Sequence, residues 1–511
     1  MFSFILRRFL SSVAVLLVAT FLVYVLVAFA VDPLENLRQS TAPNKEALME
    51  ARVEQLQLDV PSPIRYLGWL RGVGGCFVGQ CDLGVKWTTN ESVIAVLGSS
   101  IVITMRLVLL ATILAIIFGV AVGIASALRQ YSGFDYGITF LSFLLYSLPT
   151  FWVAVLLKQW VAIGFNDFLV DPVIAPVVVI ATSAVIGIIW AAAIGGDGRR
   201  RLAVFAVAGG ATLAVLGYIS ATQWLLNPGL GPVVIGVTGV GLAVVVTLLS
   251  AGLRNKRALY SAIATALLGA ALWWPLQFLF VEATTPLILG LAVVAVGVGV
   301  VIGYIFGGPD PGISARGAAI TALLVALLIF VDRMMSAWYA YSNSSVIGGR
   351  PIATIGSQTP GLHGNFWVTQ LDTFTHLLLP TMALVLISFA GYTRYSRASM
   401  LEVLNQDYVR TARAKGLTER TVIMRHAFRN TLIPLATIVP LDIAGVLGGA
   451  VITERIFGWP GMGTMFLRGL GANEVEPVMA FVLVVGAVAV LANFVADLVY
   501  AALDPRIRVH A

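Results

Sequence analysis

Charged residues are scarce in this sequence. Only 11% of its 511 residues are Asp, Glu, Lys or Arg, whereas 59% are hydrophobic. Soluble domains carry roughly 25% charged residues, so a soluble chain of this composition would lack the polar side chains to cover its surface. The scarcity excludes a soluble enzyme, a nucleic-acid-binding protein and a disordered chain. It is typical of an all-α polytopic membrane protein, because each spanning helix needs about 20 mostly apolar residues.

Cysteine and histidine are scarce as well. With two cysteines and four scattered histidines, the sequence offers no cluster with metal-ligand spacing, and we predict no metal site. Cys76 and Cys81 lie together in one polar stretch. They form a small disulfide loop if that stretch faces an oxidising exterior, and otherwise they remain two thiols.

A nucleotide-binding loop is also missing. No segment matches Gly-x4-Gly-Lys-Ser/Thr, the motif whose backbone amides cradle nucleotide phosphates. The chain therefore is not predicted to be an enzyme that hydrolyses ATP, and we expect no cofactor within it.

Apolar runs, separated by charged residues, proline and glycine, predict twelve spanning helices. Three lie within residues 1–164, where Pro149 predicts a kink in the third and residues 32–99 form an outer segment. Six lie within residues 165–340, and the last three lie within residues 341–511. The predicted spans are near Phe9–Val31, Ile101–Leu128, Phe134–Ile163, Val173–Ile194, Leu202–Leu226, Pro232–Leu253, Ala258–Phe280, Pro286–Phe306, Gly317–Ala340, His376–Tyr395, Leu432–Ile452 and Pro477–Leu503.

Basic residues indicate the orientation of these helices. The net charge is +7, and Lys and Arg collect in the cytoplasmic loops of membrane proteins. Arg7 and Arg8 precede the first apolar run, which is long enough to span and which we interpret as a retained helix rather than a cleaved signal peptide. Within residues 165–340, basic residues occupy alternate turns, which requires an even number of spans; six fits, and four is the alternative. Both termini are then cytoplasmic.

The cytoplasmic stretch 394–434 concentrates charge, with eight basic and three acidic residues. It predicts two short helices joined at Gly416, because glycine has no Cβ to block a sharp turn. Small residues at Ala412 and Ala414 would allow close packing there. Such a stretch either fixes topology and touches anionic lipid, or docks a partner protein.

This stretch resembles the ATPase-docking loop of bacterial ABC importer permeases, in the branch that serves dipeptides, oligopeptides and nickel. The run DYVRTARAKGL matches that branch, and RHAFRNTLIP (425–434) matches its continuation. Further resemblances are SLPTFW (147–152), VITERIFGWPGMG (451–463) and the closing pattern from Asn493 to Arg508. The resemblance assigns ATPase coupling to Asp407, Tyr408, Arg410, Thr411, Ala412, Arg413, Ala414, Lys415, Gly416 and Leu417.

The resemblance implies a six-helix type I permease core in the bacterial plasma membrane, formed by residues 1–164 and 341–511. Residues 165–340 then form an inserted block of six spans with no counterpart in the family. Implied partners are a second, paralogous permease subunit, two cytoplasmic ATPase subunits that hold ATP and Mg, an external solute-binding protein and membrane lipid. No nucleic acid is expected.

Several alternatives remain open at this point. The substrate is a peptide, or else nickel or another small solute. A self-sufficient secondary transporter is a different class of function, which would follow an ion gradient without an ATPase. The inserted block either belongs to the transport path or is a scaffold that binds lipid or another membrane protein.

Ionisable residues within spans are costly and often functional. Asp442 is a candidate to line the transport path. Glu454 forms a salt bridge with Arg455 at the outer membrane edge, or it acts as a gate or as a contact for the external binding protein. Asp332 and its neighbour Arg333 are expected to reach the membrane interface near a helix end. Trp273 and Trp274 are expected in the interfacial belt or in packing.

Overall fold

The computed structural model describes residues 2–308 and 311–503, and these residues form helices joined by turns and loops. Eleven helices are long and apolar enough to cross a membrane, or up to twelve when a sharply bent pair is counted as one span. Within the described residues, the only β pairing is an isolated bridge between Val85 and Ser92. The predicted all-α class and the predicted number of spans are confirmed, whereas the sidedness of the termini stays a prediction.

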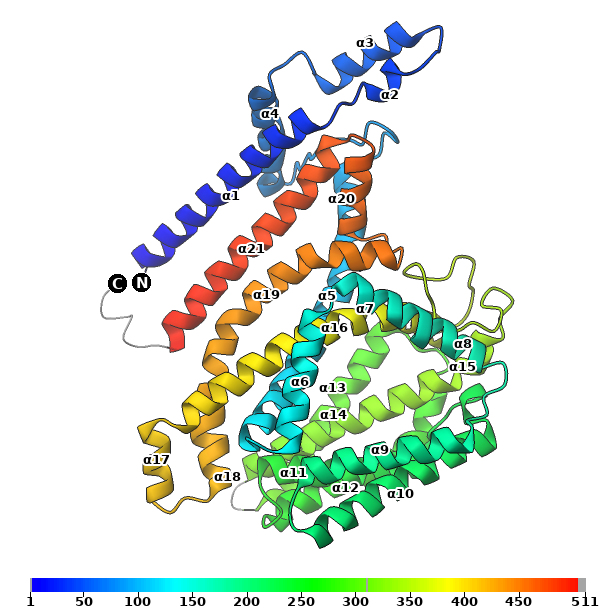
Figure 1. Cartoon of the computed structure of the whole chain (residues 1–511), viewed down its shortest axis with the longest axis vertical. Coiled ribbons are helices and arrows are strands. Elements are labelled where there is room, and N and C mark those ends of the chain that lie inside the picture. The colour runs from blue at the N-terminus through cyan, green and yellow to red at the C-terminus, as the bar shows by residue number, and fades with distance from the viewer. Residues whose placement is uncertain (1, 309–310, 504–511) are drawn as a thin grey trace. The chain divides into compact units, whose positions relative to one another are not determined.

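Each predicted apolar run corresponds to a long helix, or to a bent helix pair (Figure 1). Outside the pair, the helices long enough to span are α1 (Phe2–Ala30), α5 (Val93–Leu128), α9 (Pro176–Ile194), α10 (Gly198–Thr222), α11 (Gly231–Ser250), α12 (Lys256–Leu279), α13 (Thr285–Gly307), α14 (Pro311–Ser336), α16 (Phe366–Leu404), α19 (Phe428–Ile456) and α21 (Val475–Leu503). The shorter helices are α2 (Glu35–Arg38), α3 (Lys45–Leu56), α4 (Ser62–Gly75), α15 (Trp338–Ser342), α17 (Asp407–Ala414), α18 (Glu419–Thr421) and α20 (Met462–Gly471).

The third predicted span is broken rather than kinked. Helix α6 (Gly133–Ser147) and the segment made of α7 (Thr150–Leu156), a π-helical stretch and α8 (Gly164–Phe168) meet at 104°. Leu148 and Pro149 between them are extended, with ψ near 132° and 138°. Proline disfavours the helical conformation in the residue before it, so the chain leaves the helix at Leu148. The prediction of one kinked helix is therefore wrong.

The chain divides into two compact units. The first contains Met1–Val161, Thr354–Ser357 and Leu377–Ala511, and the second contains Ala162–Ala353 and Gln358–His376. Helix α16 contributes its first residues to the second unit and the rest to the first. The predicted cytoplasmic tail from Asp504 lies outside the described residues.

Close approach of α5 and α16 organises the first unit. A Cβ on Gly119 would lie 2.6 Å from the Cβ of Tyr392, and one on Gly123 would overlap the side chain of Ser396. Without a hydrophobic driving force between helices in lipid, such small residues permit the backbone contact that holds helices together. Helix α16 is therefore fixed against α5 along these two glycines.

An ion pair ties α6 to α16 in the same unit. The Arg397 guanidinium donates to both carboxylate oxygens of Asp135, at 2.7 and 2.9 Å. Asp135 also accepts from the Ser126 hydroxyl at 2.5 Å and from the backbone N–H of Tyr131 at 3.1 Å. The buried carboxylate is thus fully used in holding α5, α6 and α16.

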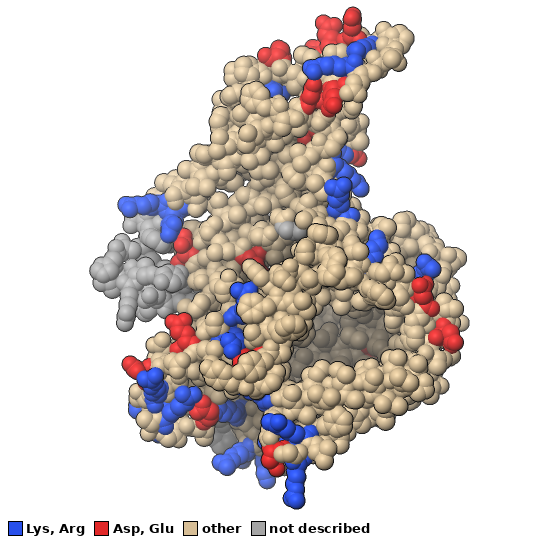
Figure 2. Space-filling model, in the orientation of Figure 1, with Lys and Arg blue, Asp and Glu red and all other residues tan. Residues whose placement is uncertain are grey.

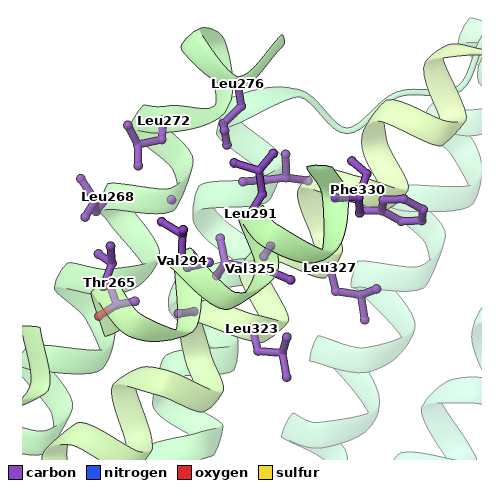
Figure 3. Close-up of a pocket in the computed structure, with 18 of the residues that line it drawn as sticks. Thr265, Leu268, Leu272, Leu276, Leu291, Val294, Leu323, Val325, Leu327 and Phe330 are labelled. Carbon is purple, nitrogen blue, oxygen red and sulfur yellow. The ribbon is translucent and has the colours of Figure 1, made fainter. Parts of the chain in front are cut away.

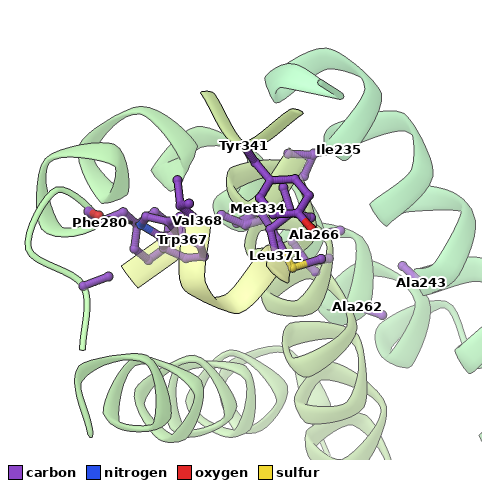
Figure 4. Packing of buried hydrophobic residues seen from close by; sticks show 13 residues of the cluster. Ile235, Ala243, Ala262, Ala266, Phe280, Met334, Tyr341, Trp367, Val368 and Leu371 are labelled. Carbon is purple, nitrogen blue, oxygen red and sulfur yellow. Dashed lines mark hydrogen bonds between the residues drawn. The ribbon is translucent and has the colours of Figure 1, made fainter. Parts of the chain in front are cut away.

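Glycines also bring α13 and α14 together in the second unit. Gly299, Gly303 and Gly307 recur every four residues on α13, and Gly303 faces the backbone of Ala315 on α14. The second unit also contains a buried cluster (Figure 4), in which Trp367 donates from Nε1 to the Phe280 carbonyl at 2.7 Å.

Asp332 is buried and its oxygens are hydrogen-bonded. This carboxylate is only 5% exposed, whereas its depth in the membrane stays a prediction. It accepts from the backbone N–H groups of Leu230 (2.6 Å) and Gly231 (3.0 Å) at the start of α11, and from Nε1 of Trp273 (2.6 Å). Free N–H groups at a helix start attract a carboxylate, so Asp332 acts as a cap supplied by α14. Trp273 packs inside, whereas Trp274 is 60% exposed.

We predict that Gly123→Leu destabilises the protein, because the added side chain forces α5 away from α16. Overpacking of this kind costs about 1–3 kcal/mol. The measurement is the temperature at which the purified protein loses its monodisperse elution peak. Gly98→Leu on the same helix is the control, since nothing lies within 4 Å of a Cβ at Gly98. Equal melting of the two variants would contradict the role of Gly123.

Candidate functional site

The segment singled out in the sequence folds as a helix, a tight turn and a second helical stretch. Helix α17 covers Asp407–Ala414 and starts after Gln406 in an extended conformation. Gly416 has φ +75°, a left-handed conformation in which a side chain is strained. Thr418 then caps α18, accepting from the backbone N–H of Thr421 at 3.4 Å, and a π-helical stretch (Val422–Ala427) leads into α19.

One face of α17 is packed against this returning stretch. Val409 and Ala412, three residues apart on α17, are buried against Val422, with Val403 and Leu404 beside them. Residues at this spacing lie on one helix face. Helix α17 is therefore held to the stretch that continues directly into α19.

The opposite face of α17 is open to solvent. Tyr408, Thr411 and Lys415 are exposed at helical spacing, and the Arg410 side chain is 67% exposed. Lys and Arg side chains gather with acidic ones over α17 and α18, whereas the long helices are almost free of charge (Figure 2). This face offers cationic and aromatic side chains to a partner.

Two polar contacts brace the turn. Arg413 donates to Glu419 across Gly416, at 2.7 and 3.2 Å, and Asn430 donates to the Tyr408 hydroxyl at 2.9 Å. The hydrogen bond with Glu419 raises the pKa of the Arg413 guanidinium. Because both partners are exposed, this ion pair contributes no more than about 1 kcal/mol. Its effect is to fix the angle between α17 and α18.

A cavity of about 350 Å³ lies in the first unit, between α6, α7, α16 and α19. Asp442 lines it and accepts from the Tyr392 hydroxyl at 2.7 Å. Its other polar lining residues are Tyr146, Thr150, Ser388 and Tyr395. Of these residues, the sequence singled out Asp442 as a path residue. The tyrosines could not be predicted from the sequence to line a cavity, because aromatic residues are common throughout this chain.

An arginine lies beside this cavity. The Arg394 guanidinium carbon is 4.6 Å from the ring centre of Tyr146 and 5.2 Å from that of Phe143. Such cation–π contacts contribute about 0.5–1 kcal/mol at exposed sites. They add a contact between α16 and α6 where the cavity is lined.

Glu454 does not line the cavity, and the expected salt bridge with Arg455 is wrong. The side chain is 1% exposed and forms no ion pair among the described residues. It accepts from the Thr104 hydroxyl at 2.5 Å and from the Thr464 N–H at 3.1 Å. The Thr104 oxygen in turn accepts from the N–H of Met462 at 2.9 Å. Glu454 therefore joins α19 to α5 and to the start of α20.

The outer segment contains the two cysteines, and Cys76 and Cys81 are joined by a disulfide after α4. No group of three or more His, Cys, Asp or Glu side chains suited to a metal occurs in the described part of the chain.

Comparison with known proteins gives matches at both ends of the chain. Residues 317–509 match the family described as binding-protein-dependent transport system inner membrane component. Residues 1–108 match the N-terminal segment described for the membrane components of the same transport systems. Together these matches take in more than half of the chain.

The chain belongs to this family of transport-system inner-membrane components. It is accordingly a multi-pass protein of the bacterial plasma membrane. Residues 109–316 lie outside both matches, and they include α6 to α13.

Curated relatives in this family are named as peptide permeases. The oligopeptide transport system permease protein OppB of Mycobacterium tuberculosis is 47% identical over 154 residues, which are 30% of this chain and 47% of that protein. AppB of Bacillus subtilis, also an oligopeptide permease by name, is 45% identical over 136 residues, 27% of this chain and 43% of the relative. The dipeptide permease protein DppB of Escherichia coli is 43% identical over 148 residues, 29% and 42% of the two chains. The aligned part is thus less than half the length of each relative.

We predict that Glu454→Ala lowers the stability of this family member, because it leaves the Thr104 hydroxyl and the Thr464 N–H buried without an acceptor. Unsatisfied buried groups cost about 1–3 kcal/mol each. Thermal unfolding of the purified protein measures the loss. Glu454→Gln keeps an acceptor oxygen and is expected to melt closer to the wild type. If the two variants melt alike, the hydrogen bonds do not stabilise this junction.

Proposed function

We propose that this chain is the permease subunit of an ATP-driven importer for di- and oligopeptides. It forms half of the translocation path and couples to cytoplasmic ATPase subunits through residues 407–417. The observation that carries the proposal is the packed helix α17, which presents cationic side chains beside a left-handed glycine turn. Because the chain has no nucleotide-binding loop, it needs a docking element through which ATP hydrolysis in a partner can move its helices.

The contacts of α17 suggest how movement of this helix is transmitted to the proposed translocation path. A partner that moves α17 moves Val422 with it, because Val409 and Ala412 pack on that residue. Val422 begins the π-helical stretch that runs without a break into α19. Asp442 on α19 lines the cavity, so displacement of α17 is passed on to the cavity wall. Coupling then requires that the partner contact α17 differently in its two states.

The proposed complex contains three kinds of protein partner besides lipid. A second, paralogous permease subunit completes the path, two ATPase subunits hold ATP and Mg, and an external solute-binding protein delivers the substrate. The printed names of the relatives support a peptide substrate over nickel or another small solute. The family match argues against a self-sufficient secondary transporter.

The arrangement of the permease core is also a proposal. Residues 1–164 and 341–511 would form the core, and residues 165–340 would be an insertion. The break at Pro149, the second compact unit starting at Ala162 and the unmatched residues 109–316 all support an added block. The family match begins at residue 317 and therefore includes most of α14. Asp332 on α14 caps the start of α11, so this helix contacts the unmatched helices directly.

We predict that Gly416→Val lowers uptake by tenfold or more in cells that express the whole transport system. A β-branched residue at φ +75° is strained by about 1–2 kcal/mol or more, so the turn between α17 and α18 reorganises. The measurement pairs uptake of a labelled peptide with the amount of protein in the membrane. Gly416→Asn is the control, because asparagine tolerates the left-handed region and open space surrounds this position. Normal uptake by the valine variant would remove the coupling assignment.

We predict that Asp442→Asn raises the apparent KM for peptide uptake about tenfold. The carboxylate would attract the α-ammonium group of a peptide, and a hydrogen bond to a charged group contributes about 1.5–3 kcal/mol. Competition by free and N-acetylated peptides measures the effect. The variant should lose the preference for the free amino terminus, whereas Ser388→Ala, on the same cavity wall, should keep it. An unchanged preference in Asp442→Asn would exclude this residue from substrate binding.

A further inference from the structure

An apolar cavity of about 350 Å³ lies within the second unit, between α12, α13 and α14 (Figure 3). Leucine and valine side chains such as Leu272, Leu291 and Val294 point into it. The one polar lining residue, Thr265, donates its hydroxyl to the Ser261 carbonyl at 2.8 Å and so has no free hydrogen-bonding need. A cavity of this kind has no partners for water or a polar ligand, and it accepts hydrocarbon.

The cavity is elongated along the spanning helices. Its lining on α12 runs from Thr265 towards the C-terminal end of the helix, and Phe280 directly follows it. These positions are separated by roughly 22 Å at the helical rise of 1.5 Å per residue. Near the Phe280 end, Trp274 is 60% exposed and its ring centre lies 6.1 Å from that of Phe278, and exposed aromatic residues of this kind are typical of the membrane interface. One end of the cavity therefore lies at headgroup depth.

A cation lies at that end. Ile329 and Phe330 on α14 line the cavity, and Arg333 is three to four residues further along, on the same helix face. The Arg333 guanidinium carbon is 6.0 Å from the ring centre of Trp367. That ring packs at 5.3 Å from both Phe280 and Phe330, which line the cavity. The guanidinium therefore lies next to the apolar lining of the cavity.

Arg333 lacks a counter-charge within the described part of the chain. Its Nε is buried and has no hydrogen-bond partner, and no carboxylate lies within ion-pair distance. The adjacent Asp332 uses its oxygens for Leu230, Gly231 and Trp273. A guanidinium carries five donors in a planar fork that matches phosphate geometry. Arg333 as a whole is half-buried, so an anion can approach its guanidinium and balance the charge.

We propose that the second unit binds one anionic phospholipid, with an acyl chain in the cavity and the phosphate on Arg333. On α14, Ile329 and Phe330 would contact the acyl chain, and Arg333 would contact the phosphate. The site belongs to the helices outside the coupling segment, and it does not depend on which solute is transported. The second unit would then be a scaffold that holds a bound lipid.

Native mass spectrometry of the purified, delipidated full chain tests the proposal by titration with phosphatidylglycerol. The wild type is expected to take up one lipid, with phosphatidylcholine bound more weakly. Arg333→Gln should weaken phosphatidylglycerol binding about tenfold, the loss expected for charged hydrogen bonds. Arg350→Gln is the charge-matched control, because Arg350 is exposed and pairs with Asp167.

A second pair of variants tests the acyl-chain part. Ala295→Phe fills the cavity and should abolish retention of the lipid, whereas Val293→Phe, on an outward position of the same helix, should not. If Arg333→Gln fails to fold, as judged by its melting temperature, this pair decides alone. Equal binding by Ala295→Phe and Val293→Phe would overturn the proposal. Displacement of the lipid by inorganic phosphate, or equal affinity for phosphatidylcholine, would overturn the assignment of an anionic phospholipid.

Discussion

The close contact between α5 and α16 at Gly119 and Gly123 is the constraint on which the first unit depends. In lipid, apolar side chains gain little by leaving hydrocarbon for a helix interface, so association rests on packing and on polar contacts. Two glycines one turn apart allow the backbones to touch. This contact fixes α16, which carries Tyr392 towards Asp442 and Arg397 towards Asp135. The cavity wall and the α6 junction both follow from it.

Buried carboxylates add hydrogen bonds that join helices in both units. Asp135 binds an arginine, Glu454 accepts from a hydroxyl and from an N–H of α20, and Asp332 caps the start of another helix. In each case at least one donor (Arg397, Thr104 or Leu230) comes from a helix distant in the sequence. An ionisable group within a span is costly unless its hydrogen bonds are complete, so each of these residues fixes one particular arrangement of helices.

The residues of the proposed coupling route are connected through α19. Helix α17 packs on Val422, the following stretch continues into α19, and α19 carries Asp442 and, further along, Glu454. The short exposed helix α17 thus contacts a stretch that continues into α19, and so into the wall of the polar cavity, without a loop. Helix α19 contains Pro434 and Pro440, where the hydrogen-bond ladder is interrupted and bending costs less.

The long helices and the glycine turn after α17 could be predicted from local sequence. Spanning length follows from uninterrupted apolar composition, and a left-handed turn selects glycine, so Gly416 and the long helices could be predicted locally. Helix packing was needed to reveal the contacts of Asp332 with Leu230 and of Glu454 with Thr104, because these donors lie about 100 and 350 residues away in the chain and no local pattern encodes their proximity. It also decided the bend at Pro149, since a proline permits either a kink or a break. A long apolar segment is stable as a helix in the bilayer whatever its neighbours are, so it can be recognised locally. Buried polar side chains find their hydrogen-bond partners only when the helices pack, so those partners cannot be read from one segment.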